Sequence, residues 1–370
     1  MRLLNAATRC LEEFVGDDIP RYAILSHTWG PNELTFDNLV RSEPVPSNAK
    51  IDGCCRRVLS RNLGYVWIDT ICINKNSSAE LSEAINSMFE WYRASAVCYA
   101  YLSDVSSLPD LDGKPPGYAY FVNKKSEFCR SRWFTRGWTL QELLAPETVQ
   151  FYDADWKYIS KNSWFYAAVA QITGVPRLVL QGETRLEDVC IAARMAWAAN
   201  RRTTRKEDIA YCLMGIFGVN MAMLYGEGDR AFTRLQEEII RKSDDESIFA
   251  WGFGSTGETS SASTQFLASS PADFEGCEGI WKGVDKPEPE GSVTNRSYWE
   301  RELTPHYSLT NKGLLIKRRL LALLNFENSR GPPETCARVG TRSATLGTAW
   351  RNPSLPDTPE VPVYGQRVPG

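Results

Sequence analysis

The first part of the chain alternates short apolar runs with segments of helical periodicity. Between the first two of these runs, the apolar residues Cys54, Val58 and Leu59 are placed at helical spacing. The expected order is therefore strand, helix, strand. This alternation is typical of a mostly parallel sheet flanked by helices. We therefore predict an α/β domain over residues 1–158. Its four apolar runs are Arg21–Ser26, Gly64–Ile68, Val97–Leu102 and Thr148–Tyr152.

Helical periodicity replaces this alternation after Asn162. A helical extension is expected over residues 159–247, and it is followed by a loop-rich region, 248–324, with possible strands from Tyr307 to Leu324. Residues 325–370 carry few large apolar side chains and are expected to be disordered. The helices expected in the extension are Trp164–Thr173, one with Leu186 to Trp197 on a single face, Thr204–Phe217 closed by Gly218, and Asp229–Lys242.

Three Ser/Thr-x-x-Glu sequences predict helix starts. They are Ser77 to Glu80, Thr139 to Glu142 and Thr204 to Glu207. In such a capping box the hydroxyl and the carboxylate each accept a hydrogen bond from a backbone amide at the start of the helix. The pattern therefore gives all three glutamates a structural role.

Composition narrows the class of protein. The 370 residues are 43% hydrophobic with a net charge of −3, which favours a globular protein of about two domains. Lys and Arg are scattered among Asp and Glu, so a nucleic-acid partner is not expected. No apolar run approaches the length of a bilayer span, so a membrane role is not expected either. We expect a soluble, cytoplasmic protein.

Cysteine and histidine content bears on metal and redox chemistry. The N-terminus has no apolar signal segment, so the ten cysteines are expected to stay reduced. With only two histidines and no Cys-x-x-Cys pair, no metal site is predicted.

Polar and aromatic residues follow two of the predicted strands directly. His27, Trp29 and Gly30 come after the first strand and Asp69 after the second. Open α/β sheets bind ligands at the carboxyl ends of their strands, which makes these residues candidates for a binding site. The alternative is that His27 and Asp69 hold the loops together while Trp29 fills a gap beneath them.

Glu142 has two competing interpretations. As a catalytic carboxylate it would stabilise a developing positive charge. As the partner of Thr139 in a capping box it would only start a helix, and spacing alone favours this second interpretation. A carboxylate in the first turn of a helix also has its ionised form favoured by the helix dipole.

Three blocks of the sequence resemble the signature of the fungal heterokaryon-incompatibility (HET) domain. The resemblance extends over about 21–241, because the segment from Thr203 to Gly228 is similar to the one that commonly follows this domain. The blocks are Tyr-Ala-Ile-Leu-Ser-His-Thr-Trp-Gly at 22–30, Tyr-Val-Trp-Ile-Asp-Thr-Ile-Cys-Ile-Asn at 65–74 and Arg-Gly-Trp-Thr-Leu-Gln-Glu-Leu at 136–143.

The resemblance implies a role in nonself recognition and cell-death signalling. The family is distantly similar to TIR domains, which have a flavodoxin-like sheet and in some members cleave NAD at a Glu of a Trp-x-x-x-Glu segment. Glu142 after Trp138 matches that segment. By this analogy, Glu142 is the candidate catalytic residue, and the candidates for binding NAD as substrate are His27, Trp29, Gly30, Asp69, Arg136 and Trp138.

These observations lead to one main hypothesis and two alternatives. The main hypothesis is a vegetative-incompatibility protein that signals through its HET domain, with other proteins of that pathway and further copies of the chain as expected partners. The alternatives are a TIR-like NAD glycohydrolase and a catalytically inactive interaction module. Under the enzymatic alternative, the polar atoms of Glu142, His27 and Asp69 are expected to converge on one pocket.

Overall fold

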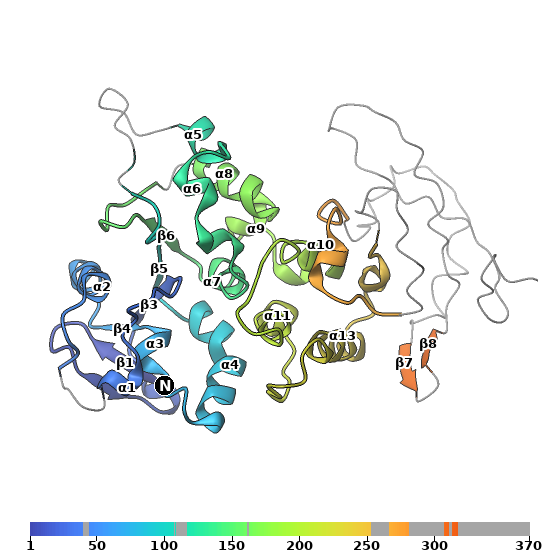
Figure 1. Ribbon diagram of the computed structural model, residues 1–370, viewed down its shortest axis with the longest axis horizontal. Helices are drawn as coiled ribbons and strands as arrows, with labels where there is room; N and C mark the ends of the chain where they lie inside the picture. The colour runs from blue at the N-terminus through green and yellow to red at the C-terminus, as the bar shows by residue number, and fades with distance from the viewer. Residues whose placement is uncertain are drawn as a thin grey trace, which may run out of the picture.

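A six-stranded sheet forms the centre of the N-terminal half of the computed structural model (Figure 1). The structure describes residues 1–39, 44–106, 108, 117–160, 163–252, 266–280, 307–310 and 313–316. The segment 325–370, which is expected to be disordered, lies outside these ranges. The strands of the sheet are β1 (Arg2–Asn5), β2 (Leu11–Glu13), β3 (Tyr22–His27), β4 (Tyr65–Trp67), β5 (Val97–Tyr101) and β6 (Val149–Tyr152).

The strand order is β2-β1-β4-β3-β5-β6, and β4, β3, β5 and β6 pair in parallel. All four predicted strands are confirmed. If only the parallel strands are numbered along the chain, so that β3 is the first and β6 the fourth, their order in the sheet is 2-1-3-4. The flavodoxin-like order begins in the same way. β1 and β2 form an antiparallel pair that extends the sheet beside β4, and the apolar pattern did not predict them.

Helices cover both faces of this sheet. α2 begins at Ala49 because the Asn48 side chain accepts hydrogen bonds from the amides of Lys50 and Ile51. Strand residues alternate between the faces, so Tyr22, Ile24 and Ser26 of β3 share one face. The helices of this half are α1 (Phe36–Leu39), α2 (Ala49–Ser60), α3 (Asp69–Cys72), α4 (Ser78–Arg93), α5 (Tyr118–Val122), α6 (Glu127–Arg130), α7 (Thr139–Leu144) and the 3-10 helix η2 (Arg132–Thr135).

A helical unit follows the sheet and packs against α4 and α7 (Figure 1). Phe89 and Trp138 contact both its core and the core of the sheet, so the two halves share one interior. Its elements are α8 (Ser163–Thr173), α9 (Arg177–Leu180), η3 (Leu186–Asp188), α10 (Ile191–Ala196), α11 (Asp208–Tyr211), α12 (Met214–Phe217), α13 (Arg230–Lys242), η4 (Glu246–Phe249) and η5 (Pro271–Phe274). A separate antiparallel pair consists of β7 (Tyr307–Thr310) and β8 (Gly313–Ile316).

Two of the long helices expected in this unit are interrupted. The helix expected from Leu186 breaks at extended backbone, and α10 restarts where Asp245 and Ser247 accept hydrogen bonds from the amides of Ile191 and Ala192. The helix expected from Thr204 is two short helices, α11 and α12. Gly218, with φ of +62°, ends α12 as expected.

The capping-box prediction is wrong for all three glutamates, although Ser77 does cap α4. Glu80 pairs with Arg2 and accepts the Asn74 amide. Glu207 accepts the amides of Gly226 and Gly228 at 2.8 and 3.0 Å. Glu142 also turns away from its own helix. Each carboxylate binds a group that lies outside the first turn of its own helix. A sequence pattern within one helix carries no information about such a partner.

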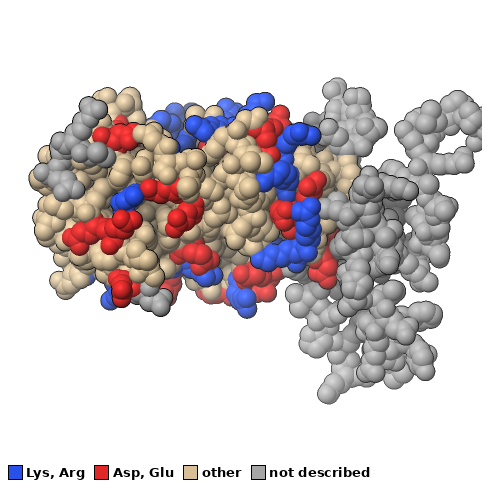
Figure 2. Space-filling model, turned by 90° about the horizontal axis from the view of Figure 1, so that it is seen from below, with Lys and Arg blue, Asp and Glu red and all other residues tan. Residues whose placement is uncertain are grey.

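The described surface carries charges of both signs. On the face shown in Figure 2, basic and acidic side chains are interleaved. Among the described residues, no helix is long and apolar enough to cross a membrane.

Candidate functional site

The carboxyl end of β3 carries two consecutive buried polar residues, Ser26 and His27. The rest of the strand is apolar apart from the Tyr22 hydroxyl. Consecutive strand residues point to opposite faces of a sheet. Ser26 accordingly meets α7 on one face, and His27 meets Lys50 of α2 on the other. The strand therefore supplies one polar group to each of two separate clusters.

The first cluster surrounds the imidazole of His27. Its Nε2 lies 3.0 Å from Asp69 Oδ1, and its Nδ1 lies 2.9 Å from Lys50 Nζ. Because the ammonium group of Lys50 only donates hydrogen bonds, Nδ1 must accept. The geometry therefore assigns the neutral tautomer that carries its proton on Nε2 and donates it to Asp69.

Asp69 links this cluster to the molecular surface. It accepts hydrogen bonds from Trp29 Nε1 at 3.0 Å and from Lys75 Nζ at 3.3 Å. The Lys75 ammonium also lies 3.5 Å from the centre of the Trp29 ring, which is 42% exposed. Burial opposes ionisation of Asp69, but the Lys75 charge and the His27 hydrogen bond outweigh it and hold the pKa of Asp69 well below its usual range.

Glu33 completes the cluster on the opposite side of His27. Its carboxylate accepts hydrogen bonds from Lys50 Nζ at 2.7 and 2.8 Å and from the Gly30 amide at 3.0 Å. A continuous row of polar groups thus runs from the Glu33 carboxylate through the Lys50 ammonium and the His27 imidazole to the Asp69 carboxylate. Each charge in the row has an opposite charge or a hydrogen-bond partner beside it.

The second cluster surrounds Glu142 on the other face of the sheet. Ser26 Oγ donates a hydrogen bond to the Glu142 carboxylate, and Trp133 Nε1 donates to Ser26 Oγ at 2.7 Å. Tyr92 of α4 also lies near Glu142 and affects its ionisation, while the Tyr92 hydroxyl donates to the Leu25 carbonyl at 3.3 Å. Thr139 donates to backbone carbonyls of η2 and the residue after it, so it does not form a capping box with Glu142.

Burial governs the ionisation of Glu142. The residue is 7% exposed, and burial raises the pKa of Glu142 to about 8. The charge of Asp69 adds to this shift, while the hydrogen bond from Ser26 and the nearby Tyr92 oppose it. The helix dipole favours the ionised form of a carboxylate in the first turn, but removal from water has the larger effect on the pKa of Glu142. Glu142 is positioned as an acid with a pKa near neutrality.

The remaining predicted residues, Arg136 and Trp138, lie against the helical unit. Arg136 donates a hydrogen bond to Thr204 Oγ1 at 3.2 Å. Trp138 packs between the two large cores and lies close to Asp208. These contacts place both side chains at the boundary between the sheet and the extension.

A buried arginine holds the segment before Glu142 in place. Nη1 of Arg201 donates to the Arg136 carbonyl and to Thr139 Oγ1, both at 2.9 Å. Arg201 is 6% exposed, and burial lowers its pKa to about 10. A guanidinium with that pKa stays charged at neutral pH, so the helical unit contributes a fixed cation behind α7.

The structure thus brings His27, Trp29, Gly30 and Asp69 together around the end of β3, while Glu142 contacts Ser26, which points to the other face of the strand. Within the described residues, no hydrogen bond joins Glu142 to His27 or Asp69. Sequence reasoning missed Glu33, Lys50 and Lys75, whose partners are defined only by the fold. A signal did exist for Ser26, since it is a polar residue inside a buried apolar strand.

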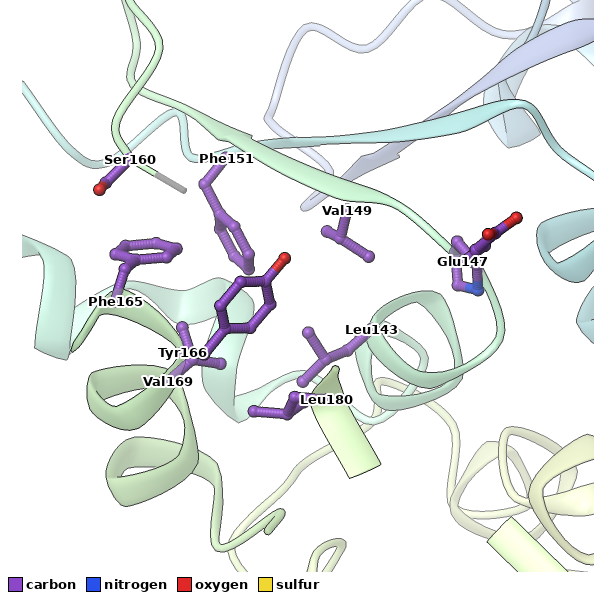
Figure 3. A pocket seen from close by; sticks show the side chains of 10 residues that line it. Leu143, Glu147, Val149, Phe151, Ser160, Phe165, Tyr166, Val169 and Leu180 are labelled. Atoms are coloured by element: carbon purple, nitrogen blue, oxygen red, sulfur yellow. The ribbon is translucent and has the colours of Figure 1, made fainter. Parts of the chain in front are cut away.

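A further pocket lies between β6 and α8 (Figure 3). Most of its lining residues are apolar, and none of the predicted site residues lines it. The ring of Tyr166 extends into it from α8, while Glu147 lies at its edge (Figure 3). The other lining residues are Leu143, Pro146, Val149, Phe151, Ser160, Phe165, Val169 and Leu180.

Comparison with known proteins gives two family matches. Residues 22–115 match the family Heterokaryon incompatibility protein (HET), and residues 230–338 match a Domain of unknown function (DUF8212). The first match contains the ends of β3 and β4, and with them His27, Trp29 and Asp69. Glu142 lies beyond it.

One relative extends the similarity. The chain is 42% identical over 249 residues to the Vegetative incompatibility protein HET-E-1 of Podospora anserina. The matched part is 65% of this chain but only 18% of the relative, so the chain spans a small fraction of that protein's length. No solved structure matches the chain significantly.

The raised pKa of Glu142 predicts a specific dependence of stability on pH. The folded state retains a proton up to about pH 8 that the unfolded state loses near pH 4.5. The contribution of Glu142 to stability is therefore fully present below pH 4.5 and is lost as pH rises through 8. We expect the wild type to lose up to about 1 kcal/mol per pH unit across this window relative to Glu142→Gln.

Urea unfolding of both proteins at a series of pH values measures this difference. Glu147→Gln, at an exposed position of the same segment, is the control and should keep the wild-type slope. Equal slopes for the wild type and Glu142→Gln would contradict the assignment.

Proposed function

We propose that this chain, whose residues 22–115 belong to the heterokaryon incompatibility (HET) family, acts in vegetative incompatibility as a signalling protein for nonself recognition and cell death. The observation that carries the proposal is that the two sequence blocks within the family match form one charged cluster. His27 at the end of β3 and Asp69 after β4 are in direct contact, although they lie 42 positions apart in the chain. The relative from Podospora anserina supports the same role through its name and 42% identity.

The cluster is suited to recognition by another protein. Trp29 is 42% exposed and is fixed in place by its bond to Asp69 and by the Lys75 ammonium against its ring. A large aromatic side chain that is already ordered loses little conformational entropy on binding, which is typical of interface anchors. The proposed partners are other proteins of the incompatibility pathway or a further copy of the chain.

Inducible expression in a filamentous fungus tests the signalling role. We expect the wild type to arrest growth and cause cell death. Asp69→Asn should abolish this effect, because it removes the charge that holds His27, Trp29 and Lys75 together. Asp229→Asn, at an exposed ion pair with Lys206, is the matched control and should stay toxic. Staining for dead cells at equal protein levels is the measurement, and a toxic Asp69→Asn variant or a harmless wild type would contradict the proposal.

Hydrolysis of NAD is a second candidate activity, favoured by the environment of Glu142. Its carboxyl group faces Ser26 and Tyr92 instead of capping its own helix. Loss of nicotinamide from NAD leaves an oxocarbenium-like ribose, which water then attacks to give ADP-ribose. An ionised Glu142 would stabilise that positive charge. An inactive interaction module remains the alternative if no NAD is consumed.

The pKa of Glu142 sets the expected pH profile of this activity. Because the ionised form is required, NAD consumption by purified protein should rise with pH and level off above about pH 8. Glu142→Gln should abolish consumption and Glu147→Gln should not. Absence of NAD consumption by the wild type, or equal consumption by Glu142→Gln, would exclude the activity and leave the signalling role untouched.

A further inference from the structure

A hollow opens beside the charged cluster, where the connections of the sheet change direction. The loop after β3 lines one side with Gly30 and Glu33, and the end of β5 contributes Tyr101 and Ser103. Lys50 lines it as well. β3 and β5 are adjacent parallel strands, and the chain crosses from β4 past β3 to reach β5. Open α/β sheets bind ligands at such a switch point, outside the carboxyl ends of the strands.

The donors in this hollow are suited to an anion. Lys50 Nζ, the Gly30 amide and the Arg132 guanidinium all provide N–H groups and no acceptor. Arg132 is 62% exposed, and its Nε lies 3.7 Å from Asp104, a loose ion pair at the surface. Lys50 and Arg132 thus bring two cations to the same hollow.

A side chain of the protein already supplies such a group. The Glu33 carboxylate uses both oxygens on Lys50 Nζ, at 2.7 and 2.8 Å, and one of them also accepts the Gly30 amide at 3.0 Å. The side chains of Glu33 and Lys50 are only 13% and 14% exposed. Glu33 lies on the irregular segment between β3 and α1, so no helix or strand fixes its backbone.

We propose that this hollow binds the oxyanion group of a small polar molecule, and that the Glu33 carboxylate occupies the site as an internal competitor. An incoming phosphate or carboxylate group replaces Glu33 on Lys50 and on the Gly30 amide, and gains Arg132. Glu33 moves toward solvent, where its charge is hydrated. Lys50 keeps its hydrogen bond to His27, so binding leaves the imidazole tautomer unchanged. The proposal does not depend on signalling or on NAD hydrolysis.

Calorimetric titration of the full chain with pyrophosphate and, separately, with succinate tests the site. Glu33→Ala removes the competitor, so it should bind at least one of the two anions on the order of 10-fold more tightly than the wild type. Glu238→Ala, which removes an exposed glutamate paired with Arg241, should bind as the wild type does. Tighter binding of pyrophosphate alone identifies a phosphate site, and tighter binding of succinate identifies a carboxylate site.

Variants of the cations complete the test. Adding Lys50→Met or Arg132→Met to Glu33→Ala should reverse the gain in affinity. Glu33→Gln keeps the size of the side chain and removes its charge, so it replaces Glu33→Ala if circular dichroism shows that the alanine variant is unfolded. If the Lys50→Met variant is unfolded, Arg132→Met takes its place, because Arg132 lies at the surface and its replacement should not disturb the fold. The proposal is overturned if neither Glu33 variant binds either anion more tightly than the wild type, or if both cation variants retain the gain.

Discussion

The hydrogen bond between Ser26 and Glu142 joins β3, in the middle of the sheet, to helix α7. A carboxyl group enclosed by protein is unfavourable as an anion unless hydrogen bonds or positive charges compensate for the lost water. Here Ser26 provides a hydrogen bond, and burial still raises the pKa of Glu142 to about 8. The orientation of α7 is therefore fixed by a polar contact inside an apolar core, and Trp133 holds Ser26 in position.

The helical unit supports the segment that carries Glu142. Arg201 reaches from that unit to the Arg136 carbonyl and the Thr139 hydroxyl, directly before Glu142. Phe89 and Trp138 pack against the cores on both sides of the boundary. The segment 22–115, which matches the HET family, thus contains the whole His27 cluster and Ser26, but not Glu142, Trp133 or Arg201. The two clusters lie on opposite faces of β3, and the Glu142 cluster alone also needs residues beyond position 115.

The sequence predicted what is local or periodic in this fold and missed what depends on distant contacts. The four parallel strands followed from their apolar runs, and His27 from its place at a strand end. Strand alternation also places Ser26 and His27 on opposite faces of β3, so a signal for two clusters is present in the sequence itself. The Ser/Thr-x-x-Glu pattern misled because Glu80, Glu142 and Glu207 bind groups outside their own first helical turns. Spacing along one segment carries no information about such partners.

The protonation state of Glu142 tests the central claim most directly. Infrared spectroscopy of the folded protein distinguishes the carbonyl band of a neutral carboxylic acid from the bands of a carboxylate, and Glu142→Gln identifies the contribution of this one residue. With a pKa of about 8, the band of the neutral acid should persist at pH 7 in the wild type and disappear above pH 8. A spectrum in which Glu142 is already ionised at pH 6 would show that the carboxyl group is not enclosed as described.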